Sequence, residues 1–218
     1  MPTEIFMNAQ DILTTSPVIP VIAIDNPDTA VDLAAALVAG GIRTLEITLR
    51  TPFGLEAIRQ IKRELPEAVV GAGTVINAEQ LKAVEDAGAA FAISPGIHQQ
   101  FIQTASTSSI PLIPGIATPG ELMLALEYGI DTLKLFPAEV VGGIQMLKAL
   151  YGPFPQAKFC PTGGITPASA AEYLNLPNVL CVGGSWLTPK EAVAKCDWHT
   201  ITRLAAEAAA LGRSVSPV

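Results

Sequence analysis

The sequence predicts an α/β protein, namely a single (β/α)8 TIM barrel with an extra N-terminal helix. Strand-like apolar runs recur along the 218-residue chain at intervals of 20 to 26 residues, so each gap can hold one helix and two short loops. Half of the residues are hydrophobic and 15% are charged, which allows a large buried core. A doubly wound open sheet is the alternative, but the first run is not followed by Gly-x-Gly-x-x-Gly.

The runs that predict strands begin near Val18, Arg43, Val69, Ala90, Ile110, Thr132, Lys158 and Val179. Because strands that alternate with helices form parallel sheets, eight such units indicate a closed barrel. Residues 3–14 are expected to form the additional N-terminal helix, and residues 213–218 a frayed tail. No linker interrupts the pattern, so residues 1–218 are expected to form one domain.

Start and stop signals predict helices in several gaps. Residues 30–39 are rich in Ala, Leu and Val and are followed by two glycines, a common helix stop. Residues 54–65 precede a proline, and Asn77 can cap a helix that ends near residue 88. Pro119 and Pro167 suit the first turns of two further helices, which end near residues 129 and 174.

Charge and cysteine usage exclude several classes of function. A net charge of −7 disfavours nonspecific nucleic-acid binding, and an anionic substrate would need locally concentrated positive charge. The three cysteines form no Cys-x-x-Cys pair and there are two histidines, so neither a disulfide framework nor a metal site is expected. We see no signal peptide and no apolar run of membrane-spanning length, and therefore expect a cytoplasmic protein without membrane partners.

A lysine, Lys134, lies within the apolar run 132–138. A charged group among apolar neighbours is costly. Removal from water lowers the pKa of a lysine, and a neutral amine can attack a ketone to form a Schiff base. The alternative is a lysine at a strand end whose ammonium group reaches water. Phe136 shares the face of Lys134 and would cover the amine.

Other candidate site residues lie where the expected strands end, which is where active sites occur in this fold. In the second run, Glu46 and Arg50 alternate with apolar residues and are expected to face the barrel interior, as a catalytic or a structural pair. Thr74 ends the third run after Gly71-Ala-Gly. Glycine pairs end the last two runs, where this fold commonly binds phosphate through backbone N–H groups, and Ser185 can add a hydroxyl donor.

The motifs that carry these residues closely resemble the 2-keto-3-deoxy-6-phosphogluconate (KDPG) and 4-hydroxy-2-oxoglutarate (KHG) aldolase family. The resemblance extends from about Ile12 to Ala208. It rests on Leu45-Glu-Ile-Thr-Leu-Arg50, Gly71-Ala-Gly-Thr74, Phe91-Ala-Ile-Ser-Pro-Gly96, Leu133-Lys-Leu-Phe-Pro-Ala138, Phe159-Cys-Pro-Thr-Gly-Gly164 and Gly183-Gly-Ser-Trp186. It implies a class I, metal-independent lyase on a (β/α)8 barrel that uses no cofactor and forms a homotrimer. Such enzymes cleave 2-dehydro-3-deoxy-6-phosphogluconate to pyruvate and glyceraldehyde 3-phosphate in the Entner–Doudoroff pathway, and often KHG to pyruvate and glyoxylate.

The resemblance also assigns roles to residues of this chain. It implies that Lys134 forms the Schiff base and that Glu46 is the general acid and base. Arg50 and Thr74 match residues that contact the pyruvate part of the substrate. The remaining expected contacts are Pro95, Phe136 and Thr162 for the substrate, and Gly163, Gly164, Gly184 and Ser185 for its phosphate.

Three other functions compete with this interpretation. The first is 2-dehydro-3-deoxy-6-phosphogalactonate aldolase, which differs in stereochemistry at the fourth carbon. The second is a metal-dependent pyruvate aldolase, which the lack of ligand clusters disfavours. The third belongs to another class: a non-catalytic phosphosugar-binding barrel in which Lys134 and Glu46 form a structural pair, and it predicts no covalent adduct with pyruvate.

Overall fold

The structure, a computed structural model, describes residues 7–211. The expected tail at residues 213–218 lies outside the described residues. The strands are β1 (Val18–Ile22), β2 (Thr44–Thr48), β3 (Val69–Gly73), β4 (Ala92–Ile93), β5 (Leu112–Ile113), β6 (Gly115–Ile116), β7 (Thr132–Leu135), β8 (Lys158–Pro161) and β9 (Val182–Gly184). The helices are α1 (Ala9–Thr14), the 3₁₀ helix η1 (Pro27–Thr29), α2 (Ala30–Ala39), α3 (Gly54–Glu64), α4 (Ala78–Asp86), α5 (Gln99–Ala105), α6 (Pro119–Glu127), α7 (Gly143–Tyr151), α8 (Pro167–Leu174), α9 (Lys190–Ala194) and α10 (Trp198–Leu211).

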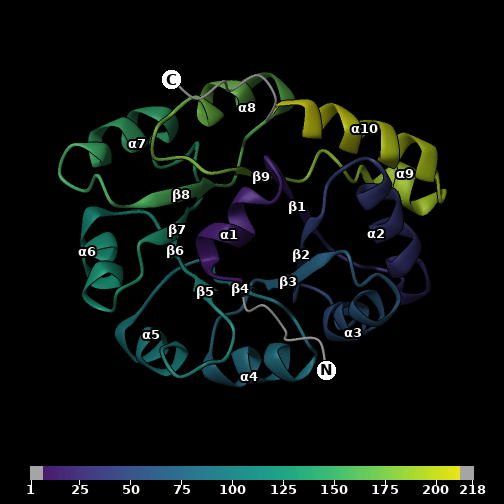
Figure 1. The fold of residues 1–218 in the computed structure, drawn as a ribbon, viewed down its shortest axis with the longest axis horizontal. Coiled ribbons are helices and arrows are strands. Elements are labelled where there is room, and N and C mark those ends of the chain that lie inside the picture. Colours follow the sequence, from purple (N-terminus) through teal and green to yellow (C-terminus); the bar gives the residue numbers. More distant parts are fainter. Residues whose placement is uncertain (1–6, 212–218) are drawn as a thin grey trace.

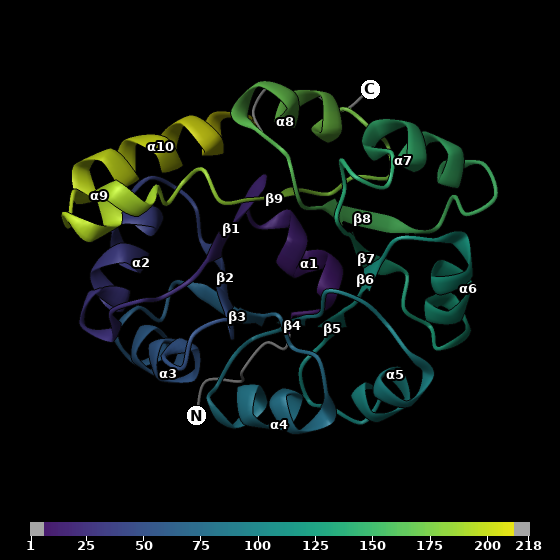
Figure 2. The ribbon, with the colours of Figure 1, turned by 180° about the vertical axis from the view of Figure 1, so that it is seen from behind.

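The strands form a curled parallel sheet in two parts. One part has the order β5-β4-β3-β2-β1-β9 and the other has the order β6-β7-β8. Isolated bridges from Phe159 to Val179 and from Thr162 to Gly183 connect the β8 and β9 segments. Helices surround the strands in both views of the ribbon (Figures 1 and 2). The carboxyl ends of parallel strands therefore point the same way and can present side chains to one another.

The capping signals that predicted the helices are confirmed. The Asn77 side chain accepts a hydrogen bond from the Gln80 N–H at the start of α4. Thr118 and Glu121 form a capping box on α6, which has a proline in its first turn. Thr166 and Ser169 form the corresponding box on α8, again with a proline in the first turn. These bonds satisfy N–H groups that have no partner within their own helix.

Two expected elements were wrong in detail. The N-terminal helix was expected over residues 3–14, of which residues 3–6 lie outside the described part. Within the described residues the helix begins at Ala9, because Asn8 has extended backbone and caps it by accepting from the Asp11 N–H. The fifth run was expected to form one strand, but it is divided into β5 and β6 at Pro114, which has no N–H to donate to a neighbouring strand. Several strands also begin later than expected; the last begins at Val182.

The buried apolar residues form two clusters. The larger lies between the sheet and its outer helices and includes Leu33 of α2 and Leu147 of α7. The smaller contains Ile12 and Leu13 of α1 together with Phe91, Ile113, Cys160 and Cys181. The Thr44 hydroxyl, at the first residue of β2, donates to the Ile12 carbonyl, so α1 covers the amino-terminal end of the sheet. Within residues 7–211, no helix is long and apolar enough to cross a membrane.

Candidate active site

Lys134 of β7 and Glu46 of β2 meet inside the curled sheet. The Lys134 Nζ donates to Glu46 Oε1 at 3.3 Å. Both residues are almost fully buried, with relative exposures of 3% and 1%. The head of Lys134 therefore does not reach water, which rules out the alternative of an exposed strand-end lysine. Glu46 faces the interior as its position in the second run predicted.

Two neighbours shape this pair. The Nζ of Lys134 lies 5.1 Å from the centroid of the Phe136 ring, within the range of a cation–π contact. On the other side, a Cβ on Gly73 would overlap the Glu46 carboxyl group. Glycine at this position of β3 therefore makes room for a carboxylate that points toward the lysine.

Arg50 and Thr74 lie together just beyond the ends of β2 and β3. The Arg50 Nε donates to the Thr74 hydroxyl at 3.3 Å. Arg50 was expected on the interior face of the second strand, but β2 ends at Thr48 and the chain turns there, so Arg50 is solvent-exposed. Thr74 has φ 63°, a left-handed backbone that costs a β-branched residue about 1–3 kcal/mol. A strained residue of this kind is typical of a binding site.

The glycine-rich turn after β8 lies beside the end of β9. The last glycine pair was expected in a turn, but Gly183 and Gly184 are the final residues of β9 itself. Thr162 forms a bridge with Gly183, and a Cβ on Gly183 would overlap the Thr162 side chain. Gly163 and Gly164 have φ values of 107° and 82°, a backbone that side chains rarely adopt. The turn leads into α8, which has eight residues. Backbone N–H groups at such a turn and helix start can bind an anion.

The structure places three other expected residues around these groups. Thr162 is buried, and its hydroxyl lies 3.4 Å from the Cys160 carbonyl oxygen, to which it donates. Pro95 is exposed on the loop after β4, where its backbone lies close to Gly115. Gly184 ends β9 and contacts the ring of Trp186, which leaves no space for a side chain at that position.

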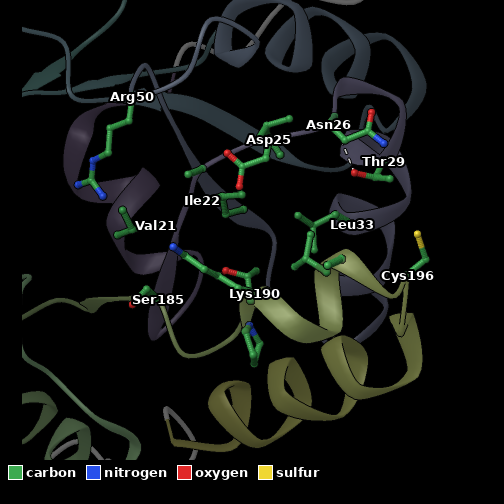
Figure 3. Close-up of a pocket in the computed structure, with 16 residues that line it drawn as sticks. Val21, Ile22, Asp25, Asn26, Thr29, Leu33, Arg50, Ser185, Lys190 and Cys196 are labelled. Atoms are coloured by element: carbon green, nitrogen blue, oxygen red, sulfur yellow. Dashed lines mark hydrogen bonds between the residues drawn. The ribbon is translucent and has the colours of Figure 1, made fainter.

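A pocket of about 600 Å³ extends from these strand ends toward α9. Arg50, Val21 and Ser185 lie along one side, and Asn26, Thr29 and Cys196 along the other (Figure 3). Its lining includes residues that the sequence had not singled out, namely Asp25, Asn26, Thr188 and Lys190. These residues follow β1 and β9. In the sequence, their position after a predicted strand was the feature that could have marked them as site residues.

Comparison with known proteins places this arrangement in a family. The family model described as "KDPG and KHG aldolase" matches residues 9–204. The chain belongs to this family. The KHG/KDPG aldolase of Escherichia coli K12 is 55% identical over 201 residues, which is 92% of this chain and 94% of the relative.

Solved structures agree with that assignment. A KDPG aldolase from Legionella pneumophila, with pyruvate captured at low pH as a covalent carbinolamine intermediate, superposes with a TM-score of 0.91. It is 49% identical and the match covers 93% of this chain and 98% of that one. A native KDPGal structure matches with a TM-score of 0.81 and 29% identity, over 91% of this chain and 95% of that one.

Below the Lys134–Glu46 pair, this member of the KDPG and KHG aldolase family has buried thiols. Burial is the main cause that raises the pKa of the Cys181 thiol, and Cys160 and the Glu46 carboxylate contribute. Cys181 therefore stays protonated at neutral pH. A neutral thiol adds no second negative charge beside Glu46.

Proposed function

We propose that this chain is a class I aldolase that cleaves 2-dehydro-3-deoxy-6-phosphogluconate to pyruvate and glyceraldehyde 3-phosphate, and KHG to pyruvate and glyoxylate. The observation that carries the proposal is the buried contact of 3.3 Å between the Lys134 amine and the Glu46 carboxylate. It is supported by family membership and by the covalent pyruvate adduct of the L. pneumophila relative.

The burial of the pair favours a chemical role over a structural one. Desolvation of two charges offsets much of their attraction, so a buried ion pair contributes little to stability compared with apolar residues. The contact places the Glu46 carboxylate where, in the proposed reaction, it can take a proton from Lys134 and leave a nucleophilic amine.

The proposed reaction proceeds through an imine. The Lys134 amine adds to the C2 carbonyl of the substrate, and the resulting carbinolamine loses water to give a protonated imine. Glu46 then removes the proton of the C4 hydroxyl, the C3–C4 bond breaks, and the aldehyde leaves. The bond's electrons neutralise the iminium and form an enamine. Protonation of the enamine at C3 and addition of water release pyruvate and restore the amine, with Glu46 as acid and base.

We propose that the two ends of the substrate bind at different strand ends around this pair. Arg50 and Thr74 bind the carboxylate, since a guanidinium offers two parallel donors. Gly163, Gly164, Gly184 and Ser185 bind the phosphate. This division is supported by the Arg50–Thr74 hydrogen bond, by the left-handed glycines and by the pocket that both Arg50 and Ser185 line. Pro95, Phe136 and Thr162 complete the wall of the substrate site in this proposal.

We further propose that the two parts of the sheet close into a (β/α)8 barrel, with α1 as an extra helix and residues 1–218 as one domain. Closure is supported by the bridges between the β8 and β9 segments and by the single residue that separates β5 from β6. A homotrimer follows from the family resemblance, and exposed apolar side chains such as Val140 and Met123 are consistent with an interface. Sedimentation equilibrium tests the trimer. A cytoplasmic location is supported by three free cysteines.

The gluconate sugar is preferred over its galactonate epimer because identity to the named KDPG aldolases is 49% to 55%, against 29% to the KDPGal structure. Cleavage rates on the two sugars, measured side by side, test this preference. A faster rate on the galactonate sugar contradicts it.

The deciding experiment is borohydride reduction in the presence of pyruvate, followed by peptide mapping. We expect a reduced pyruvyl adduct on Lys134 and none in Lys134→Arg, which keeps the charge but loses the nucleophile. Lys158→Arg is the matched control, because Lys158 begins the adjacent strand β8 and donates to the Pro177 carbonyl instead. If no adduct forms, or if Lys134→Arg still cleaves the sugar at the normal rate, the chain is not a class I aldolase.

A further inference from the structure

A buried tyrosine on α8 contacts the segment of chain that follows Lys134. Tyr173 is 1% exposed, and its hydroxyl donates to Glu139 Oε1 at 2.6 Å. Burial raises the pKa of this phenol, and the hydrogen bond to Glu139 raises it further, so the hydroxyl remains a donor throughout the neutral range. Glu139 lies five residues after Lys134, on the segment that follows β7.

Glu139 packs directly against the turn proposed to bind phosphate. Its N–H donates to the Gly163 carbonyl at 3.1 Å, and the preceding N–H, of Ala138, donates to the Thr162 carbonyl at 2.8 Å. A Cβ on Gly164 would lie 2.6 Å from Glu139 Cγ. The side chain of Glu139 thus occupies the space that the absence of a side chain on Gly164 leaves open.

The start of α7 meets the same point. The Gly143 N–H donates to the Ala138 carbonyl at 2.8 Å, and Gly143 has φ 49°. A Cβ on Gly143 would overlap the Tyr173 hydroxyl oxygen. The Tyr173–Glu139 pair therefore contacts glycines on two sides, and neither position has room for another side chain.

We propose that Tyr173 and Glu139 are positioning residues that fix the Gly163–Gly164 turn relative to Lys134. Two consecutive glycines restrict their own backbone very little, so a fixed turn needs contacts from outside. Glu139 supplies these contacts, and Tyr173 fixes the side chain of Glu139. The proposal rests on the proposed aldolase function, in which the substrate is attached covalently to Lys134 and its phosphate group is bound by the turn.

The arrangement also controls a negative charge. A carboxylate beside a phosphate site would repel the ligand, but the Tyr173 O–H draws the Glu139 carboxylate toward α8 and donates to one of its oxygens. Loss of the hydroxyl would release both the side chain and its charge next to the turn. We therefore expect Tyr173→Phe to impair phosphate binding more than Glu139→Gln, which removes the charge.

The test compares the phosphorylated sugar, which we propose is bound at both ends, with KHG, which has no phosphate group. Tyr173→Phe keeps the ring in the core, and we expect it to lower kcat/KM for the phosphorylated sugar about 10-fold, mainly through KM, because a hydrogen bond to a charged group is lost. The same variant should change kcat/KM for KHG less than about 2-fold. Tyr128→Phe, which alters a half-buried tyrosine at the end of α6, should leave both substrates unaffected.

Combining the variants separates positioning from general loss of stability. Adding Glu139→Gln to Tyr173→Phe should recover part of the lost affinity for the phosphorylated sugar, because the released charge is gone. Equal losses on both substrates, or no loss on either, would overturn the proposal. If Tyr173→Phe does not fold, Glu139→Gln alone must still change the ratio of the two substrates' kcat/KM, or the proposal fails. A separate measurement, the trapping of pyruvate on Lys134 in the unmodified protein, tests the aldolase function. If no pyruvate is trapped, the aldolase function itself is refuted.

Discussion

The Lys134 amine and the Glu46 carboxylate are in contact at 3.3 Å although 88 positions separate them in the sequence. They come from strands that are not neighbours in the sheet, β7 and β2, and both point into its interior. Phe136 covers the amine, and Gly73 leaves room for the carboxylate. The pair is therefore enclosed by side chains of the sheet interior on both of these sides.

Glu46→Gln tests the proton transfers. The amide has nearly the same shape, so the contact with Gly73 is kept and the fold should be unchanged by circular dichroism. We expect turnover of the phosphorylated sugar to fall by about 10²- to 10⁴-fold, the usual contribution of a general acid or base. Steady-state kinetics provide the measurement. Turnover within a factor of about two of normal would assign the base to another group.

Gly73→Ala tests whether the position of Glu46 matters. A Cβ at this position overlaps the Glu46 carboxyl group, so the side chain must move away from Lys134. We expect a loss of about 1–3 kcal/mol in the free energy of unfolding from overpacking, and a decrease in kcat well beyond that of an equally destabilised variant. Gly152→Ala controls for adding a methyl group without overlap, because no atom lies within 4 Å of its added Cβ, and it should keep both normal stability and normal kcat. Normal kcat in Gly73→Ala would argue against a fixed carboxylate.

Ser185→Glu tests the phosphate end. The new carboxylate would repel the substrate phosphate at the turn after β9, so KM for the phosphorylated sugar should rise strongly while KM for KHG changes little. Ser185→Ala separates the loss of the hydroxyl from the added charge and should raise KM by less than about 10-fold. Equal losses on both substrates in Ser185→Glu would mean that the phosphate binds elsewhere.

Lys190→Ala tests the charge of the pocket. Lys190 begins α9, and its amine points across the pocket toward the side lined by Ser185 (Figure 3). The other groups proposed to bind phosphate are neutral, and within residues 7–211 Lys190 makes no ion pair. We expect its removal to raise KM for the phosphorylated sugar roughly threefold to tenfold at low ionic strength and less at high salt, as for an exposed charge. Lys195→Ala, at the opposite end of α9, should have no effect at either salt concentration.

The thiols give a prediction about pH. Because the folded pKa of Cys181 is raised, its contribution to stability is complete below the unfolded value of about 8.5 and is lost as the pH rises above that value. Urea unfolding at about pH 7.5 and about pH 9.5 should show a loss of stability that is smaller in Cys181→Ala. Native protein should also have one thiol that reacts rapidly with a disulfide reagent, the exposed Cys196, and unfolded protein three.

Much of this site could be predicted from the sequence because its residues follow strands at regular intervals. Alternation along the second run indicated that Glu46 faces inward, and the apolar neighbours of Lys134 indicated burial. The first glycine pair marked the turn after β8, whereas the second pair belongs to strand β9 itself. The prediction that Arg50 faces the interior was wrong. The alternation of polar and apolar residues does not show where a strand ends, and β2 ends two residues before Arg50.

Other features could not be read from the pattern. Tyr173 resembles any apolar residue on the inner face of a helix, and its partner Glu139 is 34 positions away, so no local signal connects them. Lys190 belongs to a short helix whose place beside the pocket depends on the packing of α9. The break at Pro114 between β5 and β6 followed a known rule, but proline at a strand end and proline within a strand look alike in one sequence.

The position of α1 closes one end of the sheet interior, because the Thr44 hydroxyl donates to the Ile12 carbonyl. Ile12 and Leu13 of α1 are fully buried among the side chains below Glu46, so the amino-terminal end of the sheet interior is closed. Any opening must then lie at the carboxyl ends of the strands. In the proposed reaction the keto acid stays covalently attached to Lys134 as an enamine, so the aldehyde leaves first. The attached fragment then leaves only after hydrolysis, and both products must use the end of the interior that α1 leaves open.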